Sequence, residues 1–279
     1  MNALLLVAAL VLGGGLLWYL LIATEGVYLG QRVVIGLYNV YARRYDNIKQ
    51  FDAEWEALTL SAPLVEALSH LPQPLILDVA TGTARLPLLV CQAPNFAGSV
   101  LGLDYSWRML RVAAEKLGKT PRVALLYQDA TRLPFADETF DAVACLEALE
   151  FLPDPTATLT EIVRVARAGA PILLTNRRGF YARLMPNKIQ PSAQFAAWLR
   201  EKIGLVQVVV ERWQMEYDLI WAVKDGAPPM RYAQAWQAAL RCPACQKIGF
   251  RADATSALVC LHCERRLPIT AEGIIRYAD

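Results

Sequence analysis

Short, continuous apolar runs alternate with amphipathic segments through the middle of the chain. The runs are too short for helices and too continuous for half-exposed strands, so they predict strands that are buried on both faces. Between them, apolar residues recur at helical spacing. The predicted strands cover residues 75–79, 100–104, 123–129, 140–146 and 171–176, and the predicted helices cover 84–93, 106–118 and 154–169. This alternation indicates an α/β fold, a parallel sheet with helices on both faces.

Two further strand-like runs follow the parallel strands, at residues 205–213 and 217–224. Only three residues separate them. A connection this short joins antiparallel neighbours, because parallel strands need a long crossover. The sequence therefore predicts five parallel strands closed by a C-terminal antiparallel hairpin.

The first 24 residues carry no charged side chain. As a helix, residues 3–24 would extend roughly 33 Å, enough to cross a bilayer. A secretory signal peptide would need a basic start, a shorter apolar region and a small-residue cleavage site, and these are not evident. We therefore expect a single-pass transmembrane helix over residues 1–25. The first basic residues, Arg32, Arg43 and Arg44, all follow it, which predicts that the rest of the chain faces the cytoplasm.

The segment after the predicted anchor is also mainly apolar. Residues 27–41 contain one charged residue, Arg32, and three tyrosines. They are consistent with a helix that lies in the membrane interface, and equally with a helix that packs on the soluble domain. Residues 26–60 as a whole are expected to form juxtamembrane and lid helices.

Acidic residues stand at the ends of three predicted strands: Asp78, Asp104 and Asp129. Ligands of an open parallel sheet bind at the carboxyl ends of its strands. The small residues 80–84, with Gly82 at their centre, allow the backbone to approach a bound molecule closely. A carboxylate after the second strand suits both hydroxyls of a ribose, and Asp129 suits an exocyclic amine. Each acid alone can be a solvated strand end, but together they predict a bound nucleoside.

Four segments in this order resemble the successive motifs of class I S-adenosylmethionine-dependent methyltransferases: LDVATGTA, GLDYSWRMLRVAAEKL, QDATRLPFADETFDAV and EIVRVARAGAPILLTN. The resemblance covers residues 41–224. Within the superfamily, VATGT and YARRYDNI (41–48) are most similar to the ubiquinone/menaquinone C-methyltransferase branch. The resemblance implies a Rossmann-like methyltransferase sheet, a catalytic domain over residues 61–225 and S-adenosylmethionine as cofactor.

The resemblance also implies roles for individual residues. Gly82 and its neighbours would face the methionine part of the cofactor, Asp104 would hold the ribose, and Asp129 with the Ala130 amide would bind the adenine. Asp78 would orient the turn or the amino group of the methionine part. The expected cofactor-binding residues are Asp78, Ala80, Gly82, Asp104, Tyr105, Asp129, Ala130 and Leu146.

The chain departs from the family pattern at two places. Ala84 stands where a glycine is usual, which is expected to add a methyl group near the cofactor and weaken its binding. Arg85 and the basic run 175–179 also differ from the quinone enzymes, so the acceptor does not follow from the resemblance.

A sulfonium is already a strong methyl donor, so a general base is needed only if the acceptor must lose a proton. Neither His70 nor His262 falls near the methyl group on the motif map. The base candidates are Glu147, Glu150 and Tyr45, each of which can equally be a packing or helix-face residue. Residues 177–205 occupy the usual place of a substrate lid, and their aromatic residues suit an apolar acceptor or ordinary helix packing.

The C-terminal part of the chain holds two C-x-x-C motifs, which are separated by fourteen residues. This is the spacing of a four-thiolate zinc ribbon, with Cys242, Cys245, Cys260 and Cys263 as ligands of a structural Zn²⁺. Disulfides are the alternative, which a reducing cytoplasm disfavours. The expected ribbon covers residues 241–279 and follows a linker over 226–240. Its end resembles the zinc-ribbon family that includes the activator subunit of tRNA and protein methyltransferases, which implies a fused partner packed against the catalytic domain.

The charge balance does not indicate a nucleic-acid partner, because 28 basic and 26 acidic residues leave a formal charge of only +2. Our first hypothesis is a membrane-anchored methyltransferase that acts on a hydrophobic, lipid- or quinone-like acceptor. A second is an RNA or protein methyltransferase guided by the ribbon, since ribbons also bind RNA. A third is a non-catalytic cofactor-binding scaffold, suggested by Ala84 and by the lack of an obvious base.

Overall fold

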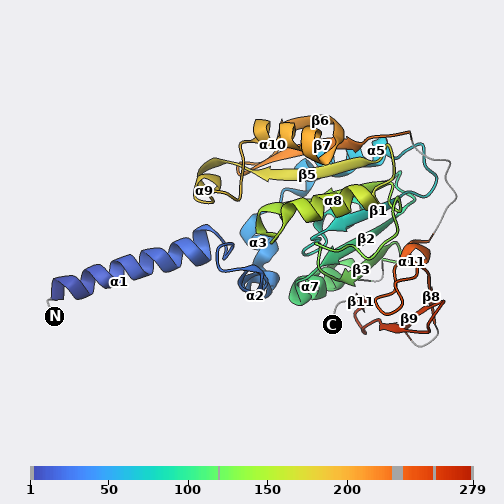
Figure 1. The fold of residues 1–279 in the computed structure, drawn as a ribbon, viewed down its shortest axis with the longest axis horizontal. Coiled ribbons are helices and arrows are strands. Elements are labelled where there is room, and N and C mark those ends of the chain that lie inside the picture. The colour runs from blue at the N-terminus through green and yellow to red at the C-terminus, as the bar shows by residue number, and fades with distance from the viewer. Residues whose placement is uncertain (1–2, 119, 228–234, 254–255, 278–279) are drawn as a thin grey trace.

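One mixed sheet of eight strands forms the centre of the molecule (Figure 1). The structure, a computed structural model, describes residues 3–118, 120–227, 235–253 and 256–277. The strand order is β11-β3-β2-β1-β4-β5-β7-β6. The five predicted parallel strands are confirmed as β1 (Leu75–Val79), β2 (Ser99–Asp104), β3 (Val123–Tyr127), β4 (Ala142–Cys145) and β5 (Pro171–Arg177).

The predicted hairpin is also confirmed. Strands β6 (Leu205–Arg212) and β7 (Tyr217–Lys224) pair in antiparallel fashion, and β7 pairs in the same way with β5. The hairpin therefore closes one edge of the parallel sheet.

Helices cover both faces of the sheet, and β1 shows why its sequence is apolar throughout. Leu75, Leu77 and Val79 point into the core beneath one set of helices, while Ile76 points into the core on the opposite face. The first set is α8 (Pro155–Val165) and α10 (Ser192–Trp198), and the opposite set is α5 (Ala62–Ala67), α6 (Arg85–Gln92) and α7 (Trp107–Leu117). The predicted three-layer α/β architecture is therefore present.

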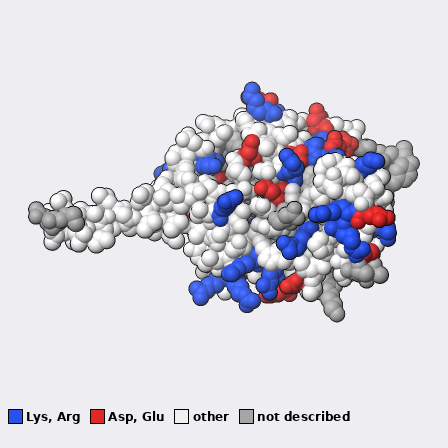
Figure 2. Space-filling view, turned by 60° about the horizontal axis from the view of Figure 1, so that its bottom comes forward, with Lys and Arg blue, Asp and Glu red and all other residues white. Residues whose placement is uncertain are grey.

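A long apolar helix projects from the domain (Figure 1). Helix α1 (Ala3–Trp18) continues as a π-helical turn, Tyr19–Ala23, and none of the residues of α1 is buried. Figure 2 shows no Lys, Arg, Asp or Glu on the projecting part. By length and composition, the 21 residues Ala3–Ala23 are enough to cross a membrane.

Two tyrosine hydroxyls fix the base of this helix to the domain. The hydroxyl of Tyr19 donates to the carbonyl of Leu184 at 2.9 Å, and the hydroxyl of Tyr28 donates to the carbonyl of Pro186 at 2.8 Å. Both carbonyls follow helix α9 (Gly179–Arg183). The projecting helix is thus held by the segment that the sequence assigned to a substrate lid.

Helix α2 (Gln31–Tyr41) packs on the soluble domain, which is the second of the two alternatives for residues 27–41. The side-chain oxygen of Asn39 accepts hydrogen bonds from the Ser106 hydroxyl and the Arg108 N–H, both at 3.0 Å, at the start of α7. Val34 is buried on the same helix. The short helices α3 (Tyr45–Lys49) and α4 (Ala53–Glu56) continue across the domain.

The cysteine module forms a small three-stranded antiparallel sheet of β8 (Phe250–Ala252), β9 (Ala257–Cys260) and β10 (Arg266–Pro268), preceded by α11 (Trp236–Ala239). Of the predicted linker 226–240, residues 228–234 lie outside the described residues. Strand β11 (Ile274–Arg276) leaves the module and pairs in parallel with β3. This eighth strand of the main sheet was not predicted from the sequence.

The importance of β11 is open to a direct test. Ile274 has no exposed surface and packs against Leu110 and Leu125. We expect Ile274→Ala to lower the free energy of unfolding by about 2–4 kcal/mol, because it leaves a cavity in a packed core. Urea unfolding of the two proteins measures the difference.

Arg276→Ala is the matched control on the same strand. Its guanidinium lies over the ring of Trp107 and its side chain is exposed, so we expect a loss of about 1 kcal/mol or less. Equal losses in the two variants would contradict the structural role of β11.

Candidate cofactor site and cysteine cluster

The turn between β1 and α6 holds an unusual backbone conformation. Ala80, Gly82 and Ala84 have φ angles of 57°, 56° and 61°, in the left-handed region that alanine seldom adopts. The hydroxyl of Thr81 donates to the carboxylate of Asp78 at 2.6 Å and holds the turn from below. Strain of this kind persists where the surrounding structure imposes it, often beside a ligand site.

The side chain of Ala84 points away from that ligand side. It is fully buried and packs with Leu110, Ala113 and Ile274, and it does not line the hollow that the turn borders. The expectation that its methyl group lies near the cofactor is therefore wrong. An extra methyl group here fills the core rather than the site.

A hollow of about 740 Å³ opens at the carboxyl ends of the central strands, and we call it the strand-end hollow. Seven of the eight expected cofactor residues line it: Ala80, Gly82, Asp104, Tyr105, Asp129, Ala130 and Leu146. The eighth, Asp78, is buried and borders an adjoining hollow of about 360 Å³, which shares Gly82 with the first. The structure thus brings together residues from the ends of four strands.

Backbone groups hold the Asp104 carboxylate in place. The N–H of Gly82 donates to Oδ2 at 2.8 Å, and the N–H of Ser106 donates to Oδ1 at 2.7 Å. Each carboxylate oxygen keeps a further lone pair for a ligand hydroxyl. Burial raises the pKa of Asp104, and the backbone hydrogen bonds oppose that rise.

Asp129 is oriented in a different way. Its Oδ1 accepts from both the N–H and the hydroxyl of Thr131, at 2.8 and 2.9 Å. Its Oδ2 accepts a hydrogen bond from the side-chain amide of Gln31, at 3.0 Å. Gln31 belongs to α2 and also lines the strand-end hollow. Thr131 therefore fixes one oxygen of the Asp129 carboxylate, and helix α2 contacts the other oxygen.

Aromatic rings line the hollow beyond the acids. Tyr105 stacks on Tyr127 with ring centroids 5.3 Å apart. Further along, Tyr38 contacts Tyr45 at 6.0 Å and Phe151 at 5.7 Å. The hollow is thus acidic where a nucleoside would lie and aromatic near Leu146, where the methyl group was expected.

Glu147 lines the strand-end hollow and the adjoining one, but two cations hold its carboxylate. Lys49 Nζ and Arg85 Nη2 are each 2.9 Å from one of its oxygens, and Arg85 also contacts Glu56 at 3.3 Å. Burial by itself would raise the pKa of Glu147, but the two cations outweigh burial and lower it. A carboxylate held in this way is a weak proton acceptor, which disfavours Glu147 as a base.

The geometry also disfavours the other two base candidates, Glu150 and Tyr45. Glu150 does not line the strand-end hollow; its carboxylate accepts from the Tyr217 hydroxyl at 2.7 Å and lies 3.9 Å from Arg177. Tyr45 does line the hollow, but burial raises the pKa of its hydroxyl, so it stays protonated at neutral pH. The catalytic roles of these residues remain predictions that the geometry does not favour.

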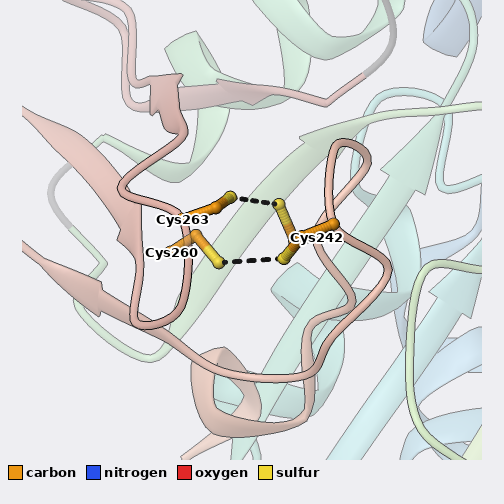
Figure 3. Close-up of side chains that lie close together, drawn as sticks. Cys242, Cys260 and Cys263 are labelled. Atoms are coloured by element: carbon orange, nitrogen blue, oxygen red, sulfur yellow. Dashed lines mark hydrogen bonds between the residues drawn. The ribbon is translucent and has the colours of Figure 1, made fainter.

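The four cysteines of the C-terminal module form a compact cluster (Figure 3). Their Sγ atoms all lie within 4.8 Å of one another. The Sγ atoms of Cys242 and Cys263 are 3.6 Å apart, and those of Cys245 and Cys260 are 3.7 Å apart. These separations are too long for disulfides and match the edge of a tetrahedron around Zn²⁺, roughly 3.8 Å for Zn–S bonds of about 2.3 Å. The donor set therefore fits a zinc ion, and the ring of His262 turns instead to the Ile248 carbonyl.

The comparisons with known proteins agree with this geometry. Residues 77–174 match a family model described as a methyltransferase domain. A demethylmenaquinone methyltransferase of Thermobifida fusca (strain YX) is 32% identical over 184 residues, which cover 62% of this chain and 70% of that protein. The chain belongs to the class I S-adenosylmethionine-dependent methyltransferases.

Further matches add to this family assignment. A demethylmenaquinone methyltransferase of Lysinibacillus sphaericus is 37% identical over 97 residues, which cover 35% of this chain and 42% of that protein. The chain covers 59% of the relative from Lactiplantibacillus plantarum, so it spans about half the length of these curated relatives.

Solved methyltransferase structures share the fold. Magnesium protoporphyrin IX methyltransferase from Synechocystis PCC 6803, with bound SAH, has a TM-score of 0.54 at 18% identity, covering 70% of this chain and 99% of that chain. A chain from a complex of the Haloferax volcanii Trm112 methyltransferase activator and a putative methyltransferase has a TM-score of 0.50 at 18% identity, covering 68% and 98%. At this identity the likeness shows the fold alone.

Several residues that line or adjoin the site were not predicted from the sequence. Gln31 and Tyr38 lie on α2, which precedes the recognised motifs, and Lys49 was not singled out. One signal was available, because Tyr45 and Lys49 are four residues apart and therefore share a helix face. The pairing of Lys49 with Glu147 joins segments far apart in the sequence and carried no local signal.

A pH test follows from the buried acid below the turn. Burial raises the pKa of Asp78 to about 7, although the hydrogen bond from Thr81 opposes the rise. Because the pKa in the unfolded chain is about 3.9, the folded state binds this proton more tightly, and that contribution to stability is lost as the pH rises towards 7. We expect the melting temperature of Asp78→Asn, relative to wild type, to increase by several degrees between pH 5 and pH 8.

Glu66→Gln, which changes an exposed acid, serves as the control in the same thermal scans. A difference between Asp78→Asn and wild type that stays constant with pH would show that Asp78 does not titrate in this range.

Metal removal tests the cysteine cluster. We expect about one zinc ion per chain by elemental analysis, and chelation should lower the melting temperature by several degrees, because the module is too small to be stable on its own core. Cys263→Ser should lose the metal, whereas Cys91→Ser, outside the cluster, should keep it. Full stability after complete chelation would rule out a structural metal.

Proposed function

We propose that this chain is a membrane-anchored enzyme that transfers the methyl group of S-adenosylmethionine to a hydrophobic, quinone- or lipid-like acceptor. The observation that carries the proposal is the strand-end hollow. It combines two fixed carboxylates, Asp104 and Asp129, with the left-handed turn at Gly82, and it ends in an aromatic wall. The family membership supports the same cofactor.

In this proposal, each part of the hollow binds one part of the cofactor. Asp104 accepts the ribose hydroxyls, Asp129 with the Ala130 N–H binds the adenine, and the turn around Gly82 lies against the methionine part. The neighbouring Tyr105 ring packs beside the nucleoside. When bound, the cofactor supplies an electrophilic methyl group on sulfur, which the protein must align with the acceptor.

The residues around Leu146 support a mechanism by positioning rather than by base catalysis. The rings of Tyr38, Tyr45 and Phe151 exclude water and hold an apolar acceptor in line with the methyl group. Lys49 and Arg85 lie beside them. Both cations are already paired with Glu147, so an acceptor such as a phenol would lose its proton to solvent water, and the resulting phenolate would then take the methyl group.

Two further observations support the class of acceptor and the location of the enzyme at the membrane. The curated relatives include demethylmenaquinone methyltransferases, which supports a quinone-like acceptor. Helix α1, as a transmembrane anchor, would keep the site beside the bilayer in which such an acceptor dissolves. The basic residues that follow the helix support a cytoplasmic catalytic domain. Zn²⁺ on the four cysteines has a structural role here, since β11 ties the ribbon to the sheet.

Transfer of a labelled methyl group tests the proposal. The full chain in detergent is incubated with methyl-labelled S-adenosylmethionine and either a membrane lipid extract, reduced to keep quinones as quinols, or total RNA. We expect label in the lipid fraction only. Asp104→Ala should reduce the rate of methyl transfer at least a hundredfold, because without the ribose contact the cofactor is no longer held in line with the acceptor.

Asp137→Ala, on the exposed surface, is the matched acid control and should transfer label at the wild-type rate. Label in RNA or protein would contradict the proposal that the acceptor is hydrophobic. Cofactor binding by calorimetry without transfer of label to any acceptor would leave only the scaffold hypothesis.

A further inference from the structure

Helix α2 presents one side to the strand-end hollow. Gln31, Val34, Ile35 and Tyr38 all line it, and their spacing of three and four residues places them on a single helix face. Asn39 fixes the helix to the start of α7 through two hydrogen bonds. This face therefore forms a wall of the hollow, and Gln31 is its first residue.

Gln31 contacts the acid at the nucleoside end. Its Nε2 donates to Oδ2 of Asp129 at 3.0 Å. The other oxygen of Asp129 already accepts two hydrogen bonds from Thr131, so Oδ2 is the oxygen available to an incoming base. The carboxamide of Gln31 thus lies within reach of any group that binds there.

Adenine offers two edges to such a site. Its exocyclic amine has two hydrogens, one on the side of N1 and one on the side of N7, and N7 is an acceptor. A carboxamide complements the amine and N7 together, because it carries one acceptor and one donor side by side. A carboxylate can take only one hydrogen of the amine and cannot donate to N7 when ionised.

We propose that Gln31 is a specificity-determining residue for the adenine base of the cofactor. Its Oε1 accepts the amine hydrogen on the N7 side and its Nε2 donates to N7, while Asp129 takes the hydrogen on the N1 side. Nε2 exchanges its bond to Asp129 for one to N7, so no donor is left unpaired. This inference rests on the proposed cofactor site and extends it to the helix that follows the projecting α1.

Calorimetry with two nucleosides separates this contact from the rest of the site. The full chain in detergent is titrated with S-adenosylhomocysteine and with its 7-deaza analogue, in which a C–H replaces N7. We expect wild type to bind the 7-deaza analogue about tenfold more weakly, the effect of one lost hydrogen bond to a partly buried donor. In Gln31→Ala the two nucleosides should bind with affinities within about twofold of each other.

Two further variants keep the test independent of folding. Gln31→Glu retains the shape of the side chain but loses the donor, so it should also lose the discrimination. Asn39→Ala loosens the same helix without touching the base, so it should weaken both nucleosides equally and keep the tenfold ratio.

Equal binding of the two nucleosides by wild type would overturn the inference while the proposed function stands. A tenfold ratio that survives in Gln31→Ala would overturn it as well. Failure of wild type to bind S-adenosylhomocysteine would remove the proposed function, and the role of Gln31 with it.

Discussion

The carboxylate of Asp104 joins two neighbouring strand ends, and the geometry of the site depends on it. It ends β2, yet it accepts the N–H of Gly82 in the turn that follows β1. The N–H of Ser106 holds its second oxygen and places it at the start of α7. Both donors are backbone groups, so the carboxylate is positioned without the entropy cost of ordering further side chains. The edge of the sheet therefore has its binding shape before a ligand arrives.

Charge compensation shapes the region beyond that edge. Buried charges persist only when they are paired, and the pairing of Glu147 with Arg85 and Lys49 follows this rule. The same pairing makes Glu147, which lines the hollow together with Asp104 and Asp129, a weak proton acceptor. A second pair, between Arg177 and Glu25 at 2.8 Å, connects the end of β5 to the residues just after the projecting helix. Ionic contacts thus bind the N-terminal region to the sheet on which the site is built.

The sequence predicted the sheet well because its strands are buried on both faces, and β1 (Leu75–Val79) has the predicted bounds. Alternation of strands and helices also placed the acids at one edge. The errors concern side-chain direction, which tertiary packing decides: Ala84 points into the core and Glu150 away from the hollow. Ile274–Arg276 is too short for a periodic signal, and Gln31 lies outside any recognised motif.

The pairing of β11 with β3 has a consequence for biogenesis. Until residues 274–276 are synthesised, the outer edge of β3 has unpaired N–H and C=O groups, which is the situation that promotes aggregation. The pairing is also highly non-local, and such contacts form slowly because loop closure must come first. The four-cysteine cluster belongs to the module that delivers β11, so this edge of the sheet would stay open until that module has folded. Folding of the module would then limit how much of the catalytic domain escapes aggregation, separately from any effect on turnover.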